Sequence, residues 1–588
     1  PVAHSGPVGP AEPDEDLADA SPRPLPWLVS GVGAAGLRAQ ARRVAEFLAS
    51  DPDAPDADLA YSLARSRAAL ADRAVVVAAD RNGALAGLAA LADGDHGPHT
   101  AVGTATARDR VAFVFPGQGS QWPGMAAELM RTAPVFRESI EACAASLAPH
   151  VDWSLTKVLR GESGAPTLER VDVVQPALFA VMVSLAALWR SCGVEPAAVV
   201  GHSQGEIAAA HVAGALSLDD AARVVAVRSR ALRVLAGRGG MVSVVAPVDH
   251  VRRSIARWGG AVSVAAVNGP QSVVISGEPA ALDEALAAFD AGGVRARRID
   301  VDYASHSAQI DEIHDTLLAA LSGVRPRPAA VPFYSTVSGE PVDTTALDAA
   351  YWVRNLRETV QFHRTVERLL DDGHSTYVEL SPHPVLTVAV AETAEAVGPE
   401  RAGDVRVVES LRRNEGDLAR LLTAVGEAHV HGVAVDCREH LHVVAAHLDP
   451  RCPDEHRPDR LAGHKYPSYR DNGHTGRRLR RAPGGRSSPG RPGRVRPRSR
   501  TPSTRSSGAR GFVAGVVRQV PPARRPPGPL LRRPRQGPER RFLGDPREGR
   551  HGDPRAPRPA RRGADPFERI AAARSAEPIR AALPAETA

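Results

Sequence analysis

Residues 197–205 join an apolar run to a glycine-flanked serine, and they read Ala197-Ala198-Val199-Val200-Gly201-His202-Ser203-Gln204-Gly205. The apolar run predicts a buried strand, and the apolar spacing after it predicts a helix. Their junction matches G-x-S-x-G, the pattern of a nucleophile elbow, in which a sharp turn projects a serine oxygen at a helix N-terminus. An ordinary glycine-flanked turn is the alternative, but the flanking strand and helix favour the elbow. In such an elbow the Gln204 backbone N–H can donate to a developing oxyanion.

A second junction of this kind lies upstream. Val111–Phe115 predicts another buried strand, and it ends in Pro116-Gly117-Gln118-Gly119-Ser120. A polar residue between glycines at this place, Gln118, can offer its backbone N–H to an active site. A plain turn is one alternative and a phosphate-binding loop is another. The unmet G-x-G-x-x-G pattern and the absence of a following lysine argue against a nucleotide site.

Strands of this kind alternating with helices predict an α/β fold with a large subdomain like that of the α/β-hydrolases. Residues 241–299 change pattern to strand, helix, strand, strand, helix, strand. This order is ferredoxin-like, so we expect a small subdomain inserted into the larger one. A further α/β unit precedes both, with helices expected near residues 31–50 and 57–66, a strand at 74–78 and a loop over 94–108.

The formal net charge of +6 comes entirely from one end of the chain. Residues 471–588 hold 29 arginines against nine acidic residues, a balance of +20, whereas residues 1–470 balance at −14. The acidic part has a globular composition, so we expect neither nucleic acid nor membrane among its partners. The basic part is mostly Arg, Pro, Gly and Ser, and we expect residues 438–588 to be a disordered tail.

Other counts narrow the class of protein. The four cysteines lack C-x-x-C spacing, which argues against a disulfide scaffold and a zinc site, so we expect no metal. We see no membrane-spanning stretch and no signal-peptide pattern, and we expect a cytoplasmic protein. The chain begins without methionine, which suggests a processed product or a piece of a longer protein.

One arginine falls where a charge is costly. The segment Ser217-Leu218-Asp219-Asp220 predicts the start of a helix, on which Arg228 shares its face with Val224 and Ala231. A guanidinium on an apolar stripe needs an anion. A structural ion pair would satisfy it, and so would a substrate carboxylate bound bidentately.

The candidate general base is His306, in Tyr303-Ala304-Ser305-His306-Ser307. It follows directly after the expected inserted subdomain, at a junction where a cleft would form. A structural histidine is the alternative. His202, beside the serine, would point away from it in a tight elbow and is expected to be structural.

Together these motifs resemble the acyltransferase domains of modular type I polyketide synthases and, more distantly, malonyl-CoA:acyl carrier protein transacylases. The resemblance covers about residues 24–436. It rests on Phe115-Pro116-Gly117-Gln118-Gly119-Ser120-Gln121, Gly201-His202-Ser203-Gln204-Gly205-Glu206, Val227-Arg228-Ser229-Arg230 and Tyr303-Ala304-Ser305-His306. By this resemblance residues 1–23 are a linker, 24–105 (with Pro26-Trp27-Leu28-Val29-Ser30) the ketosynthase-to-acyltransferase linker domain, 106–400 the acyltransferase domain and 401–437 the post-acyltransferase linker.

The resemblance implies a Ser-His dyad. His306 would take the proton of Ser203 as the serine attacks an acyl-CoA, and would relay it when the phosphopantetheine thiol of an acyl carrier protein attacks the acyl-serine. The other implied roles are an oxyanion hole from Gln118 and Gln204, a carboxylate socket at Arg228, a histidine-orienting backbone carbonyl at Gln361 and a cleft lining from Asn268. No cofactor is expected to be bound, and the implied partners are an acyl-CoA, an acyl carrier protein and the adjacent ketosynthase.

The extender unit can be inferred in the same way. Tyr303-Ala304-Ser305-His306 resembles the methylmalonyl-type signature, whereas malonyl types usually carry His-Ala-Phe-His. Gln204 after the serine and the segment 170–176 also fit the methylmalonyl pattern. The small Ser305 leaves room for an α-methyl group, which is worth only about 1–3 kcal/mol of discrimination. We therefore expect methylmalonyl-CoA as the substrate.

Two other classes of function stay open. An α/β-hydrolase-type esterase or thioesterase would need an acidic residue and then a histidine after Ser203, with an HGGG-type loop that the sequence lacks, and it would leave Arg228 without a role. An inactive fragment of a synthase is the third interpretation. After Asp436 the family's usual continuation is missing, so residues 438–588 are interpreted as out-of-frame translation of GC-rich DNA or, alternatively, as a genuine basic tail for nucleic acid or an acidic carrier protein.

Overall fold

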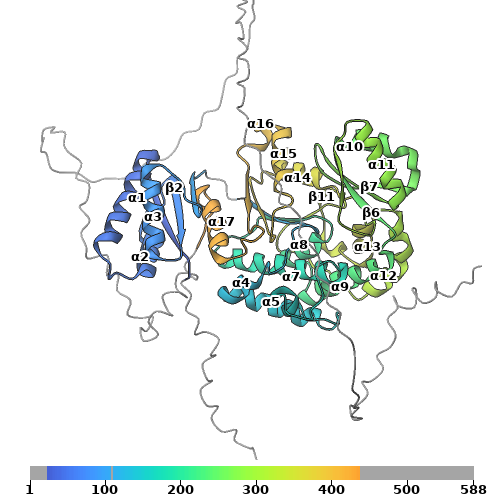
Figure 1. The fold of residues 1–588 in the computed structure, drawn as a ribbon, viewed down its shortest axis with the longest axis horizontal. Coiled ribbons are helices and arrows are strands. Elements are labelled where there is room, and N and C mark those ends of the chain that lie inside the picture. The colour runs from blue at the N-terminus through green and yellow to red at the C-terminus, as the bar shows by residue number, and fades with distance from the viewer. Residues whose placement is uncertain (1–22, 107–109, 437–588) are drawn as a thin grey trace, which may run out of the picture. The chain divides into compact units, whose positions relative to one another are not determined.

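The computed structural model describes residues 23–106 and 110–436, which contain three β-sheets (Figure 1). The expectations made above for residues 1–22 and for the tail at 438–588 lie outside the described residues. Each sheet belongs to a different part of the chain, and each is described below with the helices that cover it.

The largest sheet has six strands, in the order β11-β10-β5-β4-β12-β13. They are β4 (Val111–Phe115), β5 (Ala198–Gly201), β10 (Phe333–Ser335), β11 (Glu340–Pro341), β12 (Thr376–Glu379) and β13 (Arg406–Glu409). Neighbouring strands are parallel except β10 and β11, which pair antiparallel at one edge. Every residue of β4 and β5 is buried, as expected of parallel strands whose two faces are both covered.

Helices cover this sheet, and nearly all residues of the 21-residue α7 are buried. Its length and mean hydropathy of 1.9 would suffice to cross a membrane, but 94% of its apolar window is buried inside the protein, so it is a core helix. The helices of this part are α4 (Ala127–Thr132), α5 (Pro134–Leu147), α6 (Leu155–Arg160), α7 (Val171–Ser191), α8 (Gly205–Ala213), α9 (Leu218–Leu232), α12 (His314–Leu321), α13 (Ala349–Arg357), α14 (Phe362–Asp371), α15 (Thr387–Val397) and α16 (Pro399–Ala402). Short 3₁₀ turns occupy Arg233–Leu235, Ala256–Ala261, Ala308–Ile313 and Thr344–Ala346.

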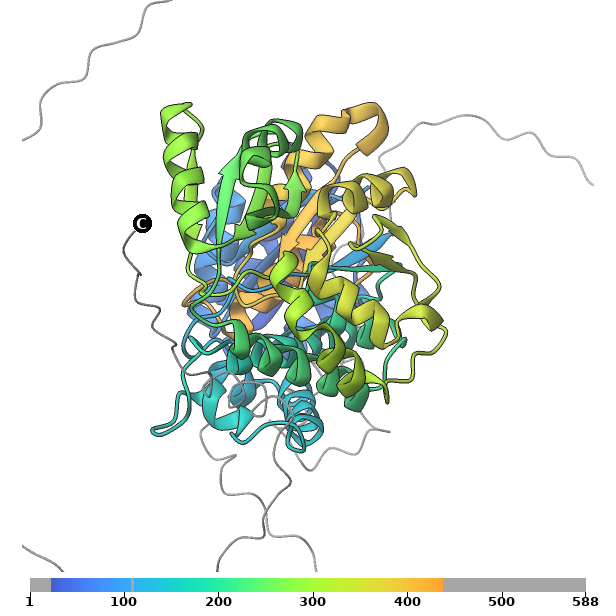
Figure 2. The same cartoon turned by 90° about the vertical axis from the view of Figure 1, so that its right-hand side faces the viewer.

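The second sheet forms the inserted subdomain, in the β-α-β-β-α-β order that the sequence predicts. Its elements are β6 (Gly240–Val245), α10 (Val248–Ile255), β7 (Val262–Gly269), β8 (Ser272–Gly277), α11 (Pro279–Ala291) and β9 (Ala296–Ile299), drawn in green in Figure 2. The strand order is β7-β8-β6-β9, and all pairs are antiparallel. Because the first and last strands, β6 and β9, are neighbours, the chain enters and leaves the subdomain side by side.

The third sheet, at the start of the chain, is antiparallel in the order β1-β2-β3. Its elements are β1 (Leu25–Gly31), α1 (Gly33–Ser50), α2 (Asp56–Ser66), β2 (Asp72–Ala78), α3 (Arg81–Asp93) and β3 (Thr100–Thr104). The prediction of a loop over residues 94–108 is therefore wrong at β3. Between Thr100 and Thr104, β3 holds only Ala101 and Val102 as apolar side chains, so its strand form depends on pairing with β2 and not on its own pattern.

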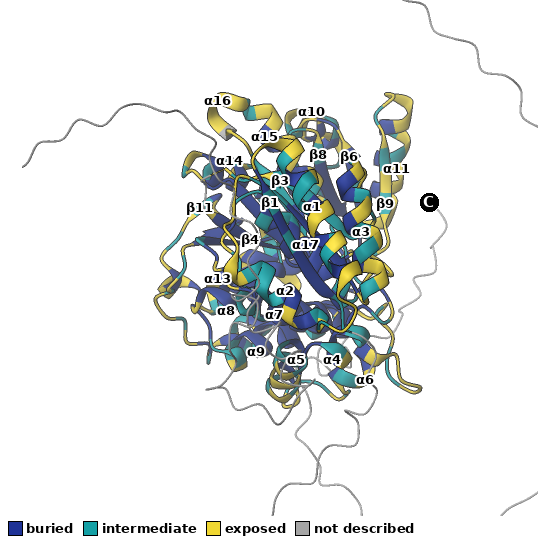
Figure 3. Ribbon diagram, turned by 90° about the vertical axis from the view of Figure 1, so that its left-hand side faces the viewer, coloured by how far each residue is buried: buried dark blue, intermediate teal, exposed yellow. Residues whose placement is uncertain are grey.

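The helix α17 (Leu418–Val430) returns from the larger part to cover this small sheet. Gly426 allows the close approach, because a Cβ there would lie 3.1 Å from the Cβ of Val75 on β2. Arg73 Nη1 donates to the His429 carbonyl oxygen at 3.0 Å. Figure 3 shows the buried residues of the sheet and of α17 in dark blue, with exposed faces on α1 and α3. The sheet at the start of the chain and the last described helix, α17, thus pack on each other.

Candidate active site

Ser203 lies in the sharp turn between β5 and α8. Its backbone φ of 55° falls in the left-handed region that non-glycine residues rarely adopt, a strain of roughly 1–3 kcal/mol. A Cβ on Gly201 would lie 2.2 Å from the Glu206 backbone nitrogen, and one on Gly205 would lie 2.0 Å from the Phe115 carbonyl oxygen. Only glycine fits at both places. The elbow expected from G-x-S-x-G is therefore present, with Ser203 just before the N-terminus of α8.

His306 reaches Ser203 from the segment that follows the inserted subdomain. Its Nε2 lies 2.8 Å from Ser203 Oγ, and its Nδ1 lies 2.7 Å from the Glu358 carbonyl oxygen. Since a carbonyl only accepts, Nδ1 carries the proton and Nε2 can accept the hydrogen bond of the Ser203 hydroxyl. Burial and the nearby positive charge of Arg228 lower the pKa of His306 to about 3. The imidazole is therefore neutral at physiological pH, the form that a general base requires.

The sequence assigned the histidine-orienting carbonyl to Gln361, and this assignment is wrong. Gln361 is the N-cap of α14, and its carbonyl oxygen accepts from the backbone N–H and the hydroxyl of Thr365, at 3.0 and 2.8 Å. An N-cap carbonyl takes part in the first intrahelical hydrogen bond, so it is already engaged. The carbonyl that reaches His306 belongs to Glu358, at the extended end of α13.

Arg228 projects from α9 toward the same serine. Its Nη2 donates to Ser203 Oγ at 2.9 Å, and its Nη1 donates to Asn355 Oδ1. The residue is 2% exposed, which confirms the expected burial. Within the described ranges both of its side-chain partners are neutral, and its Nε has none. Burial lowers the pKa of Arg228 to about 10, so the group stays charged at neutral pH and needs a counter-ion.

The loop after β4 packs directly against the elbow. A Cβ on Gly117 would lie 3.3 Å from His202 Nδ1, so the loop brings the next residue, Gln118, beside the Ser203 turn. In the part of the chain that the structure describes, neither the Gln118 nor the Gln204 backbone N–H has a hydrogen-bond acceptor. The side-chain Nε2 and Oε1 of Gln204 are also buried without partners. Both backbone N–H groups are thus available to a substrate.

The three residues before His306 connect the loop after β4 to the inserted subdomain. Tyr303, Ala304 and Ser305 are all buried. The Tyr303 hydroxyl donates to Gln118 Oε1 at 2.7 Å, and burial raises the pKa of Tyr303 to about 12, which keeps it a donor. Ser305 Oγ lies 3.8 Å from the sulfur of Met241 on β6. Residues 303–305 therefore contact the loop after β4 on one side and the inserted subdomain on the other.

Sequence analysis gave no role in the site to two residues of this cluster, although Gln175 lies in the segment 170–176 cited above. Asn355, on α13, bonds both Arg228 and the Ser203 carbonyl oxygen. Gln175, on α7, donates to Gln118 Oε1 at 3.4 Å. Each is a polar side chain on a buried helix face, which is the signal that could have revealed them. His202, expected to be structural, lies with its Nε2 2.8 Å from Asn268 Oδ1 on β7.

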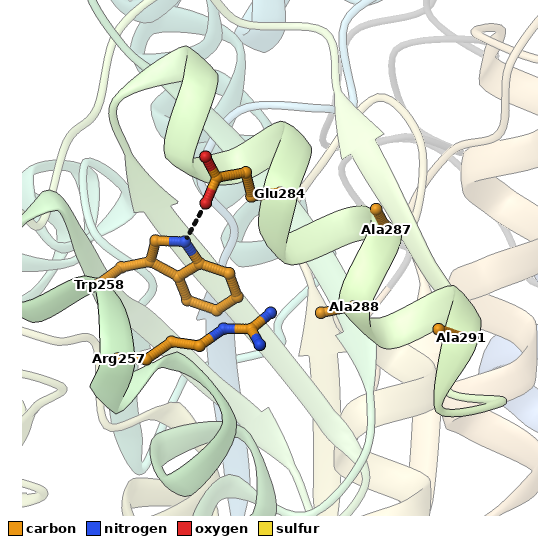
Figure 4. A pocket seen from close by; sticks show the side chains of 6 residues that line it. All are labelled: Arg257, Trp258, Glu284, Ala287, Ala288 and Ala291. Atoms are coloured by element: carbon orange, nitrogen blue, oxygen red, sulfur yellow. Dashed lines mark hydrogen bonds between the residues drawn. The ribbon is translucent and has the colours of Figure 1, made fainter.

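A separate open depression of about 710 Å³ lies on the inserted subdomain (Figure 4). Its lining residues are Arg257, Trp258, Glu284, Ala287, Ala288 and Ala291, none of them a candidate site residue. The indole N–H of Trp258 donates to Glu284 at 2.8 Å, and the Arg257 guanidinium lies over the indole, 4.0 Å from its centroid. Over residues 23–106 and 110–436 there is no cluster of three His, Cys, Asp or Glu side chains able to hold a metal ion.

Comparison with known proteins shows which family has these features. The family model of the acyl transferase domain matches residues 112–435, and that of the RhiE-like, KS-MAT linker domain matches residues 29–95. The chain is 76% identical over 427 residues to the spectinabilin polyketide synthase system protein NorA of Streptomyces orinoci, covering 73% of this chain and 22% of NorA. It is 53% identical over 428 residues to erythronolide synthase EryA3 of Saccharopolyspora erythraea, covering 72% of this chain and 12% of EryA3. The chain thus spans less than a quarter of these relatives.

One solved structure is similar to this chain over nearly the whole of its own length. The acyltransferase domain from module 8 of the salinomycin polyketide synthase is 56% identical, with a TM-score of 0.68, over 70% of this chain and 97% of that one. The likeness confirms the α/β fold expected from the sequence. The chain therefore belongs to the acyl transferase domain family, in the form found in modular type I polyketide synthases with the KS-MAT linker domain that precedes it.

Proposed function

We propose that this acyltransferase loads a methylmalonyl extender unit from CoA onto Ser203 and passes it to the phosphopantetheine thiol of an acyl carrier protein. The observation that carries the proposal is the buried guanidinium of Arg228, 2.9 Å from Ser203 Oγ and without a charged partner among the described residues. An acyl group that ends in a free carboxylate supplies the missing counter-ion and places its thioester near the serine.

The steps follow from the hydrogen bonds of the dyad. The Ser203 oxygen attacks the thioester carbonyl carbon as His306 Nε2 takes the hydroxyl proton. The tetrahedral oxyanion is held by the backbone N–H groups of Gln118 and Gln204, each worth about 2.7–4 kcal/mol in such sites. The C–S bond breaks, CoA leaves with the proton from His306, and an acyl-serine ester remains. The carrier thiol then attacks this ester as His306 takes the thiol proton, and the ester C–O bond breaks as His306 returns that proton to Ser203 Oγ.

The esterase interpretation fits the site less well. A hydrolase triad holds the histidine with a carboxylate, whereas His306 Nδ1 donates to the backbone carbonyl of Glu358. Such a site also has no use for an unpaired buried arginine beside the nucleophile. Both facts favour transfer of a charged acyl group over hydrolysis of a neutral ester.

Competition between two acyl-CoAs tests the extender. With equal methylmalonyl-CoA and malonyl-CoA, we expect the mass of the acylated protein to show mainly the methylmalonyl adduct, and an excess of the malonyl adduct would reject methylmalonyl as the extender. Replacing Ser305 by phenylalanine should reverse the preference roughly 5- to 100-fold, because the larger ring fills the space that the α-methyl group needs. Ser322→Phe, at an exposed serine that caps the C-terminus of α12, is the matched control.

A further inference from the structure

The side chain of Asn355 joins the candidate nucleophile to the candidate carboxylate socket. Its Oδ1 accepts from Arg228 Nη1. Its Nδ2 donates to the Ser203 carbonyl oxygen at 3.2 Å and to Glu206 Oε2 at 2.7 Å. The residue is 2% exposed, so water does not replace these partners. Three elements, α8, α9 and α13, therefore meet at this one amide.

The partners fix which way the amide faces. The Ser203 carbonyl can only accept a hydrogen bond, and the charged guanidinium of Arg228 can only donate one. A flipped amide would set its NH₂ group against the NH₂ group of Arg228 and its oxygen against the Ser203 carbonyl. The side chain of Asn355 therefore has one orientation, and its Oδ1 fixes the position of Arg228 Nη1.

Glu206 is the carboxylate nearest to this arrangement, and its hydrogen bonds are already satisfied. It is fully buried and accepts from the Thr336 hydroxyl at 2.7 Å, the Tyr351 hydroxyl at 2.7 Å and Asn355 Nδ2, besides the Thr336 backbone N–H. Asn355 stands between this carboxylate and Arg228. The guanidinium is therefore held by the neutral amide oxygen of Asn355 and not by the Glu206 carboxyl group, whose pKa is raised by burial.

We propose that Asn355 is a positioning and specificity-determining residue: it aims the Arg228 guanidinium at the substrate while leaving its positive charge for the substrate carboxylate. The inference rests on the proposed function. A leucine at 355 would leave one arm of Arg228 without a partner. An aspartate, nearly the same in shape, would share a proton with Glu206 and bring negative charge into direct contact with Arg228, so that the protein itself would supply the counter-ion.

The test compares acylation of Ser203 by methylmalonyl-CoA with acylation by propionyl-CoA, which has no free carboxylate, in Asn355→Asp and Asn355→Leu. We expect the ratio of kcat/KM for the two substrates to fall roughly 10- to 100-fold in both variants. In Asn355→Asp the loss should appear mainly in KM, because the aspartate competes with the substrate for Arg228. Propionyl transfer reports that the fold, Ser203 and His306 remain intact.

Tyr351→Phe is the matched control, since it removes one donor to Glu206 but leaves the contact between Asn355 and Arg228. In this variant the ratio of kcat/KM for methylmalonyl-CoA to that for propionyl-CoA should stay within about twofold of the wild-type ratio. Three results would overturn the proposal and leave Asn355 a structural role only. They are an unchanged kcat/KM ratio in either Asn355 variant, an equal fall of the ratio in Tyr351→Phe, and a parallel loss of kcat/KM for both substrates in both Asn355 variants. If the wild-type protein itself does not prefer methylmalonyl-CoA over propionyl-CoA, the proposed function fails and not the role of Asn355 alone.

Discussion

Replacing Arg228 by alanine should lower kcat/KM for methylmalonyl-CoA by roughly 30- to 5,000-fold, because removing one member of a buried charge pair costs about 2–5 kcal/mol. Acylation by propionyl-CoA should persist or rise. The buried guanidinium donates to Ser203 Oγ and lowers the pKa of His306, and both effects disappear with it. Rates of acyl-enzyme formation with the two substrates, measured by quenched flow and intact mass, check this reversal.

The nearby Arg233 supplies the control, because it lies just after α9 with a side chain that is 57% exposed. Arg233→Ala should leave both rates within about twofold. Arg228→Lys keeps a charge but loses the planar guanidinium, so its kcat/KM for methylmalonyl-CoA should lie between those of the wild type and the alanine variant. Unchanged substrate selectivity in Arg228→Ala would show that the arginine is a structural group and not a carboxylate socket.

Replacing His306 by alanine should slow acylation by roughly 10²–10⁴-fold with every acyl-CoA, which is the usual contribution of a general base. The lowered pKa of His306 adds a pH prediction. Because the imidazole is already neutral well above pH 3, the wild-type acylation rate should not fall as the pH drops from 8 to 6 through the usual histidine range.

His314→Ala, at an exposed residue on α12, should change the rate little. A His306→Ala protein that acylates at the wild-type rate would contradict the role of His306 as base. A wild-type rate that halves near pH 6.5 would contradict the lowered pKa and would place the histidine in a more solvated environment than the structure gives it.

Local sequence patterns were sufficient to predict the fold class and part of the candidate site. The elbow could be predicted because G-x-S-x-G forces a left-handed serine between two glycines that have no room for a Cβ. Arg228 could be predicted because its helix places a charge on an apolar face. Each signal consists of residues that lie close together along the chain, so a single sequence contains it.

The features that were missed depend on contacts between distant segments. The strand β3 exists because β2 pairs with it, and its own residues give little indication of a strand. The histidine-orienting role was assigned to Gln361 from its position in a motif. Its carbonyl oxygen instead accepts from Thr365 at the start of α14, and the Glu358 carbonyl oxygen accepts from His306. Asn355 acquires its importance from residues more than 100 positions away, Arg228 and Glu206, which no periodicity links to it.

The central claim is that Ser203 carries a dicarboxylic acyl group between CoA and a carrier thiol. Incubation with methylmalonyl-CoA, followed by intact-mass and peptide mass analysis, should show one methylmalonyl group on the peptide that contains Ser203, lost in Ser203→Ala. Addition of a phosphopantetheinylated acyl carrier protein should move that group to the carrier. An adduct that survives in Ser203→Ala, or an acyl group released to water faster than to the carrier, would contradict the account.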